Sequence, residues 1–321
     1  MIVAESLSKS YSGHRAIDDV SFRIGEGEIV GLLGLNGAGK STILKILGCF
    51  LLPSGGKATV AGYSVDENPQ AIRRLIGYLP DTPPLYDEMT VDSYLRYVAK
   101  LKNVEAKAVE SRVQQVMGHT NTDKVAKARL GELSHGFRQR VGIAQALVHE
   151  PRVIILDEPI NGLDPVQIVE MRDLITSLRG KHTVVLSSHI LSEITRTCDR
   201  VLVVDHGRLV AEGSEAQLQA KMTKSMRLAM DVASLPGGLV DSLSRIPGVS
   251  SVSQVNDASS NGGGHALGSQ RLVIATESDV RAKVAKVAVD SGAGLLGFGR
   301  SEAGLEGLFM KLIKPKSGEA H

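Results

Sequence analysis

The sequence contains no tryptophan, and aromatic residues make up only 3% of it, so aliphatic side chains must form most of any core. It has only two cysteines, Cys49 and Cys198, which lie far apart without metal-site spacing and are expected to be reduced core residues. No segment has the roughly twenty apolar residues of a membrane-spanning helix, and the N-terminus lacks a signal-peptide pattern. We therefore expect a chain that is soluble by itself and reaches a membrane only through a partner.

The chain also has no large excess of positive or negative charge. The formal net charge is only +2 at pH 7, which gives no electrostatic case for nucleic acid, and no nucleic-acid partner is expected. The length of 321 residues suggests about two domains.

The sequence does contain a pattern typical of phosphate-binding loops. Residues 34–41 read GLNGAGKS, which matches G-x-x-x-x-G-K-[ST] at every fixed position between a strand-like run, EIVGLL, and a helix-like run, TILKIL. Glycines let the backbone approach a triphosphate closely, and the helix start offers unpaired N–H groups and the positive end of its dipole. Lys40 would reach the β- and γ-phosphates, and the Ser41 hydroxyl would bind Mg²⁺. The alternative, a chance glycine-rich turn before a helix, is disfavoured by the flanking strand and helix. The expected nucleotide contacts here are Gly34, Asn36, Gly37, Ala38, Gly39, Lys40, Ser41 and Thr42.

Strands and helices are predicted to alternate around this loop. Apolar runs bounded by turns indicate strands or hairpins at 2–7, 18–24, 28–34, 54–65, 153–159, 183–188 and 201–213. Helical periodicity indicates helices at about 40–49, within 91–117, and at 136–149 and 166–179. The wholly apolar run VIIL at 153–156 is typical of a parallel strand buried on both faces.

The composition changes after about residue 225. Strands are expected at 226–232, 249–255, 271–276 and 294–299, and helices at 236–246 and 278–292. The order strand-helix-strand-strand-helix-strand fits a ferredoxin-like split unit. A last amphipathic helix is expected at 304–313, followed by a charged tail. We expect disorder in the tip at 256–269 and in this tail.

Two carboxylates end the strand at 153–156. Asp157 can bind Mg²⁺ directly or through water. Glu158, one residue further, projects differently and can polarise the water that attacks a γ-phosphate. The alternative is an ordinary strand-end turn with solvated acids, but the matched phosphate loop favours the catalytic interpretation.

The segment LSHGFRQR at 133–140 places Ser134 and Gly136 just before a predicted helix. It resembles the signature sequence of ATP-binding cassette (ABC) ATPases, in which a serine and a following glycine at a helix N-terminus bind the γ-phosphate. Taken alone, most such runs are only helix N-caps. The position of the run between the phosphate loop and the carboxylate pair supports the resemblance.

Three further segments resemble parts of this family. Tyr11 resembles the aromatic residue that stacks on adenine, although it could be a half-buried strand tyrosine. Residues 162–164, Gly-Leu-Asp, resemble the D-loop. His189 resembles the switch histidine that contacts the γ-phosphate; a lone histidine at a strand end is usually structural, but its position favours function. The resemblance covers about residues 1–222.

The sequence departs from the family at three positions. Asp81 stands where the family usually has glutamine; a carboxylate can still bind Mg²⁺, but its reach is shorter and it adds charge. His135 replaces the usual second glycine of the signature, and Phe137 stands where glutamine is common. This signature and the C-terminal run LEGLFMKLI resemble the ABC-2-type subgroup, which exports drugs and polysaccharides or serves gliding.

The resemblance implies an α/β fold with a P-loop NTPase core of the ABC ATPase kind. Residues 1–222 would form a mixed sheet with an antiparallel β subdomain and a helical insertion at about 83–150. A small α+β ferredoxin-like domain for dimerisation or accessory functions would follow at 223–313, and a disordered tail at 314–321. The expected magnesium ligands are Ser41, Asp81 and Asp157, and the expected catalytic residues are Glu158 and His189.

The implied function is ATP hydrolysis that drives an ABC membrane transporter, with ATP and Mg²⁺ as ligands. In the family, two cassettes pair head to tail, and each ATP lies between the phosphate loop of one chain and the signature of the other. This chain has one of each, so a homodimer is expected. A membrane-spanning permease subunit would contact the segment from Asp81 to about Met117, and the chain would lie peripherally on the cytoplasmic side of the membrane.

Two rival functions stay open at this point. A soluble ABC ATPase with an assembly or regulatory role is one, although such proteins usually carry tandem cassettes or long coiled-coil insertions. A regulator whose C-terminal domain senses a ligand is the other. For that domain we favour dimerisation or allosteric control over catalysis, because its sequence contains no clustered catalytic residues.

Overall fold

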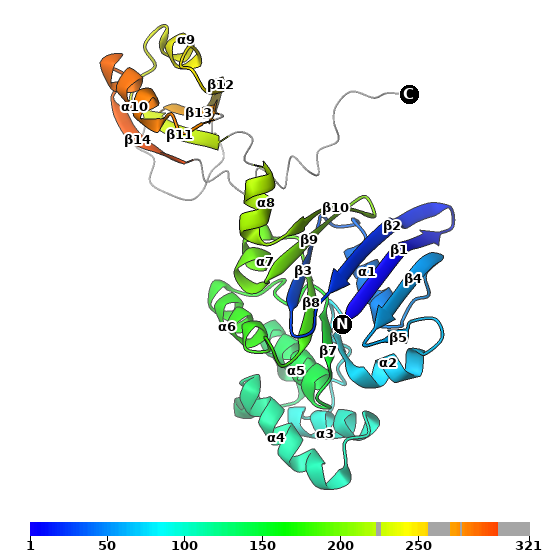
Figure 1. Cartoon of the computed structure of the whole chain (residues 1–321). Helices are drawn as coiled ribbons and strands as arrows, with labels where there is room; N and C mark the ends of the chain where they lie inside the picture. Colours follow the sequence, from blue (N-terminus) through cyan, green and yellow to red (C-terminus); the bar gives the residue numbers. More distant parts are fainter. Residues whose placement is uncertain (223–225, 256–269, 277, 301–321) are drawn as a thin grey trace. The chain divides into compact units, whose positions relative to one another are not determined.

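A six-stranded sheet forms the centre of the first of two units, Met1–Glu215 and Ala216–His321 (Figure 1). The computed structural model describes residues 1–222, 226–255, 270–276 and 278–300. The strand order in the sheet is β10-β9-β3-β8-β7-β6; all neighbours are parallel except β9 and β10, which form the predicted hairpin. The strands are β3 Ile29–Leu33, β6 Ile76–Leu79, β7 Val153–Leu156, β8 Thr183–Ser188, β9 Arg200–Asp205 and β10 Arg208–Gly213.

A second, antiparallel sheet has the order β2-β1-β4-β5. Its strands are β1 Ile2–Tyr11, β2 His14–Ile24, β4 Gly55–Val60 and β5 Tyr63–Ser64. The first two are longer than the apolar runs predicted, because bulges let polar residues continue the ladder. Ser6 and Asp19 adopt left-handed backbone conformations, with φ of 48° and 53°, where the register of β1 and β2 shifts.

Helix α1, Lys40–Leu47, shares one core with both sheets. Its Ile43, Leu44 and Leu47 are fully buried or nearly so, beside β1 and β2 residues and the apolar residues of β3 and β7. Burial of this helix holds the phosphate loop, which directly precedes it, against the end of the six-stranded sheet.

Helices α5, α6 and α7 lie on the other side of the six-stranded sheet (Figure 1). They span His135–Leu147, Pro165–Thr176 and Leu191–Thr197. The two periodic segments predicted within 91–117 form α3, Val91–Leu101, and α4, Val109–His119, which pack on each other and on α5. Short 3-10 turns occur at Ala106–Ala108, Asp123–Val125 and Leu130–Glu132.

Three helices of seven or eight residues were not predicted from the sequence. They are α2 Pro69–Leu75, α7 Leu191–Thr197 and α8 Glu215–Met222. Two turns of helix present too few apolar positions to establish a period. The predicted domain boundary, after residue 222, falls at the end of α8, whereas the two compact units divide at its start.

The second unit contains a four-stranded antiparallel sheet of order β12-β13-β11-β14 and two helices. Its elements are β11 Met226–Val232, α9 Leu239–Ser244, β12 Val249–Val255, β13 Gln270–Thr276, α10 Arg281–Asp290 and β14 Leu295–Arg300. Alternate strand residues such as Leu228, Met230, Leu272 and Ile274 are buried with Leu243 of α9 in a separate core. The predicted tip at 256–269, the helix at 304–313 and the tail lie outside the described residues.

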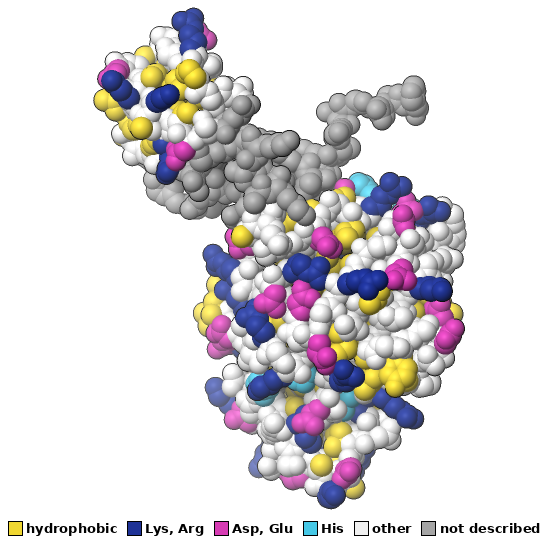
Figure 2. Space-filling view, viewed as in Figure 1, with side chains coloured by type: hydrophobic (Ala, Val, Ile, Leu, Met, Phe, Trp, Pro, Cys, Tyr) yellow, Lys and Arg dark blue, Asp and Glu magenta, His cyan; other side chains and the backbone are white. Residues whose placement is uncertain are grey.

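Lysine and arginine side chains are interspersed with acidic ones over the visible face of the first unit (Figure 2). Of the helices in the described ranges, none is both long enough and apolar enough to cross a membrane.

Two glycines allow α5 to approach β6 closely. A Cβ at Gly77 would lie 2.1 Å from the carbonyl oxygen of Ala146, and a Cβ at Gly142 would lie 2.4 Å from Cδ1 of Leu79. The helix that begins with the signature therefore rests directly on the strand that leads to Asp81.

We predict that Gly77→Ala lowers the free energy of unfolding of the first unit by about 1–3 kcal/mol or more, because backbone atoms on both sides must move apart. Gly118→Ala on α4 is the matched control. A Cβ there meets nothing within 4 Å, so this substitution is expected to be neutral or stabilising by up to about 1 kcal/mol. Urea titration followed by circular dichroism measures both. Equal stability of the two variants would contradict the close contact.

Candidate functional site

The carboxyl ends of four parallel strands bring the predicted site residues to one edge of the six-stranded sheet. The phosphate loop follows β3, Asp81 follows β6, Asp157 and Glu158 follow β7, and His189 follows β8. Since β3, β8, β7 and β6 are neighbours in that order, residues up to 155 positions apart in sequence meet there.

The loop before α1 has the backbone that phosphate binding requires. Gly37 and Gly39 have φ of 81° and 108°, and a Cβ at Gly39 would lie 2.7 Å from the carbonyl oxygen of Ala16. No side chain caps the N-terminus of α1. The first N–H groups of α1 are therefore not used by a capping side chain, as anion binding at a helix N-terminus requires.

Lys40 carries a buried charge at the start of α1. Its side chain is only 5% exposed, and Nζ donates hydrogen bonds to the carbonyl oxygens of Gly34 at 2.8 Å and Leu35 at 3.3 Å. The same Nζ lies 3.2 Å from Oε1 of Glu158. A buried ammonium group must be paired, and here its partners come from the loop and from the end of β7.

Asp157 joins three strand ends through hydroxyl groups. Its Oδ1 accepts hydrogen bonds from Oγ of Ser41 at 3.0 Å and from Oγ of Ser187 at 2.7 Å. Ser187, the fifth residue of β8, also accepts a hydrogen bond from the backbone N–H of Glu158 at 2.8 Å. This serine was not among the predicted site residues, because a serine inside an apolar strand carries no local signal of its role.

Glu158 turns away from Asp157, as predicted from its position one residue further along the chain. Its φ of 49° is left-handed, a strained conformation for a residue with a Cβ and one that is frequent at functional sites. Its Oε2 lies 2.9 Å from Nδ1 of His189, and its Oε1 faces Lys40. Glu158 is 12% exposed and His189 36% exposed, so solvent reaches the pair from the histidine side.

These groups border a cavity of about 500 Å³. The predicted residues that line it are Asn36, Gly37, Gly39, Lys40, Ser41, Thr42, Asp81, Glu158 and His189. It is also lined by Ala16, Leu35 and Asn161, which were not predicted. Asn161 has a sequence signal in hindsight, since it directly precedes the D-loop-like residues, whereas Ala16 reaches the cavity only because β2 crosses over the loop.

The other predicted residues do not line this cavity. Three of them support the residues around it. Gly34 accepts a hydrogen bond from Lys40, and Asp157 accepts one from Ser41. The carbonyl oxygen of Ala38 accepts a hydrogen bond from the Gly207 N–H. Tyr11 ends β1 with 44% of its surface exposed and has Nζ of Lys9 5.4 Å from its ring centre.

Ser134 and Gly136 lie at the start of α5 and are not among the residues that line this cavity. Ser134 is the N-cap of α5, and its Oγ accepts a 3.5 Å hydrogen bond from the Phe137 N–H. Gly136 is buried, and a Cβ there would lie 2.4 Å from Oε1 of Gln167. One chain thus contains two separate candidate phosphate sites.

The chain resembles known proteins over the first unit. It matches the family model described as "ABC transporter" over residues 17–161. It is 36% identical over 219 residues to an uncharacterized ABC transporter ATP-binding protein, YxlF, of Bacillus subtilis, covering 68% of this chain and 72% of that protein. It is 37% identical over 214 residues to the bacitracin transport ATP-binding protein BcrA of Bacillus licheniformis, covering 66% of this chain and 69% of the relative.

Solved structures agree. The ATP binding subunit of an ABC transporter superposes with a TM-score of 0.64 at 31% identity, covering 69% of this chain and 93% of the other. The dimeric post-hydrolysis structure of the ATP-binding cassette MJ0796 with ADP and Pi gives 0.62 at 25% identity, covering 67% of this chain and 98% of the other. With a phosphate loop and a carboxylate pair at one sheet edge, these matches show that the chain belongs to the ATP-binding subunits of ABC transporters.

Proposed function

We propose that this chain is the ATP-hydrolysing subunit of an ABC-2-type exporter and lies peripherally on the cytoplasmic side of a membrane beside its permease. The observation that carries the proposal is the contact of Lys40, Glu158 and His189 around one cavity. Relatives named for bacitracin transport and Nod factor export favour export over a soluble assembly or regulatory role.

When the loop binds the triphosphate of ATP, Lys40 would exchange its contact with Glu158 for one with a phosphate group. Nζ of Lys40 is held by the carbonyl oxygens of Gly34 and Leu35 and by Glu158, so it already lies against the backbone of the loop. A γ-phosphate that enters the cavity can take the place of Glu158 beside Nζ. The carboxylate is then released to act on water.

The oxygen atoms around Ser41 fit a magnesium ion. The Ser41 hydroxyl is bonded to the Asp157 carboxylate, and the Asp81 residue lines the same cavity, which is the hard oxygen set that Mg²⁺ prefers. When bound, Mg²⁺ neutralises charge on the phosphates. Asp157 would hold it with Ser41, and Ser187 would keep the Asp157 carboxylate oriented.

Glu158 would accept the proton of the attacking water. His189 is hydrogen-bonded to one carboxylate oxygen of Glu158, which fixes the orientation of the other. His189 would also contact the γ-phosphate, since both residues line the cavity.

The signature residues would act in a second copy of the chain. Ser134 and Gly136 do not line the cavity that holds Lys40, which supports a head-to-tail homodimer in which each signature completes the other chain's site. The MJ0796 cassette, a structural relative, is dimeric. Tyr11, exposed at the end of β1, would stack on the adenine base.

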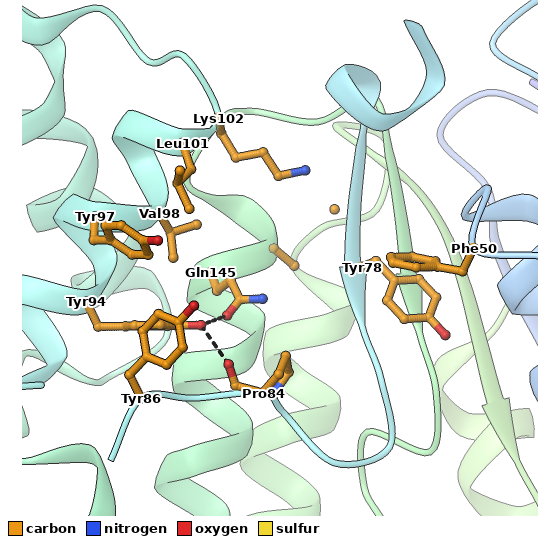
Figure 3. A pocket seen from close by; sticks show the side chains of 12 residues that line it. Phe50, Tyr78, Pro84, Tyr86, Tyr94, Tyr97, Val98, Leu101, Lys102 and Gln145 are labelled. Atoms are coloured by element: carbon orange, nitrogen blue, oxygen red, sulfur yellow. Dashed lines mark hydrogen bonds between the residues drawn. The ribbon is translucent and has the colours of Figure 1, made fainter. Parts of the chain in front are cut away.

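A groove between α3 and β6 would receive the permease. It has a volume of about 260 Å³, and the rings of Tyr86, Tyr94 and Tyr97 gather on one side of it, with Phe50 and Tyr78 on the other (Figure 3). The Tyr94 hydroxyl has one proton to donate, and two acceptors face it, Oε1 of Gln145 and the carbonyl oxygen of Pro84. Burial raises the pKa of Tyr94 to about 12.

The amphipathic lining of this groove fits an amphipathic helix of a membrane protein. Tyr86 is 52% exposed, Tyr97 39% and Leu101 61%, although all three are apolar or aromatic. Lys102, whose pKa burial lowers, adds a cation at one end of the groove. Part of the lining, from Pro84 to Lys102, belongs to the segment 81–117 for which permease contact was predicted, whereas Phe50, Tyr78 and Gln145 lie outside that segment.

The second unit would be a ferredoxin-like domain for dimerisation or allosteric control. Its strand-helix order and the sheet order β12-β13-β11-β14 support this. No group of three or more His, Cys, Asp or Glu side chains that could hold a metal ion occurs in its described ranges.

Lys40→Ala is expected to reduce ATP hydrolysis by about a hundredfold or more, because a charge-stabilising donor to the γ-phosphate is lost. A steady-state phosphate-release assay on the full chain measures this. Lys107→Ala is the control, since Lys107 is 86% exposed and is paired only with Glu105 in a surface ion pair. Unchanged hydrolysis in the Lys40 variant would refute the assignment of the loop.

Glu158→Gln is expected to bind ATP but not turn it over, and so to accumulate as an ATP-bound dimer. Size-exclusion chromatography with light scattering, with and without ATP and Mg²⁺, detects the change in mass. Glu105→Gln on the surface serves as the control. Finding only monomers with ATP would count against the proposed head-to-tail mechanism.

Tyr97→Ser is expected to weaken association with the permease by about tenfold or more, the effect of removing an aromatic anchor. Co-purification of the tagged chain with its native membrane fraction measures the association. Tyr63→Ser is the matched control, since Tyr63 is 42% exposed on β5, outside the groove. Equal retention of both variants would place the permease contact elsewhere.

A further inference from the structure

Two side chains of α5 contact backbone carbonyl groups of residues that line the chain's own nucleotide cavity. Nε2 of His135 lies 3.0 Å from the carbonyl oxygen of Asn161, and Nε2 of Gln139 donates a 3.2 Å hydrogen bond to the carbonyl oxygen of Asp81. His135 and Gln139 are four residues apart, so they lie on one face of the helix. Asn161 and Asp81 both line the cavity that contains Lys40 and Glu158.

The same helix turn carries the residues that are proposed to bind the second chain's nucleotide. Ser134 caps α5, and Gly136 follows one residue after His135. A displacement of this turn toward the partner's phosphate would therefore pull on Asn161 through His135 and on Asp81 through Gln139.

Close packing between α5 and the segment after β6 would pass a displacement of the helix on to that segment. A Cβ at Gly142 would lie 2.4 Å from Cδ1 of Leu79 and 3.2 Å from Cβ of Pro83, so the helix cannot slide there without displacing the chain. One turn further, Oε1 of Gln145 and the carbonyl oxygen of Pro84 both face the single hydroxyl proton of Tyr94 (Figure 3). Closely packed elements of this kind change position together.

Gln139 has a buried side-chain oxygen that could gain a hydrogen bond if α5 moved. It is 1% exposed, and its Oε1 has no hydrogen-bond partner within the described part of the chain. Buried acceptors are nearly always paired. If α5 and the Asp81 segment move together and bring a donor to Oε1 of Gln139, the new hydrogen bond would stabilise that conformation relative to the present one.

His135 supplies a bond that a glycine signature lacks. The related family usually has a glycine at this position, which has no side chain to reach Asn161. In this chain the imidazole lies over the residues that follow Glu158, with its Nε2 3.3 Å from the position of a Cβ at Gly162. The link between signature and catalytic segment is thus carried by a side chain.

We propose that His135 and Gln139 are positioning residues that couple occupation of the chain's signature by the second copy's ATP to the placement of Asn161 and Asp81 in its own site. This rests on the proposed head-to-tail dimer. Each chain would then hydrolyse its ATP fastest when its own signature is engaged, which makes the two sites positively cooperative.

The test compares His135→Gly, His135→Gln and Gln139→Met in the full chain. ATP binding is measured by titration calorimetry, and the rate of hydrolysis is measured against ATP concentration. His135→Gly and Gln139→Met are expected to lower kcat between about fivefold and 150-fold, the usual range of coupling between sites, and to bring the Hill coefficient toward 1. ATP affinity and the thermal midpoint are expected to stay near wild type. His135→Gln keeps a donor of similar reach and is expected to preserve kcat.

Matched substitutions on α4, His119→Gly and Gln114→Met, are the controls, since both side chains bond only at the exposed surface. Wild-type kcat and cooperativity in His135→Gly and Gln139→Met would overturn the coupling. A parallel loss of ATP affinity and thermal stability would also overturn it, because it would show a merely structural role. Absence of ATP hydrolysis by the wild-type chain would refute the proposed function instead.

Discussion

The buried ammonium group of Lys40 lies where the phosphate loop, α1 and the end of β7 meet, and the site is arranged around its charge. A cation with only 5% exposure is tolerable only if several oxygen atoms face it. The structure supplies two loop carbonyl oxygens and one carboxylate oxygen of Glu158. The tight loop, the helix behind it and the strained backbone at Glu158 all serve to bring these oxygens to one point.

A hydroxyl group extends this arrangement to the neighbouring strand. Ser187 of β8 donates to Asp157 and accepts from the Glu158 N–H, so the two acids cannot move independently of β8. His189, two residues later, contacts the Glu158 carboxylate. β8 lies between β3 and β7 in the sheet, so the strand next to the one that carries the phosphate loop also holds both acids.

The first unit contains two helix starts that are proposed to bind phosphate. The start of α1 lines the cavity, whereas Ser134 and Gly136 at the start of α5 do not. In the proposed dimer these become complementary surfaces, and His135 and Gln139 connect them within each chain. The aromatic groove beside α3 borders the same segment, through Pro84 and Tyr94, so a permease bound there would act on the Asp81 segment as well.

The loop at 34–41, the acids at 157–158 and the run at 133–140 were predictable because each motif consists of adjacent residues whose chemistry is local. The strands that carry them were predictable too, since their apolar runs are short and bounded by turns. The sequence by itself thus determined the ligand class and the family. Tertiary structure alone decided which groups meet: Ser187 between the acids, Ala16 and Asn161 at the cavity, and His135 and Gln139 on the catalytic segments. These contacts depend on strand order and helix packing between residues far apart in the chain, and no local pattern records such distances.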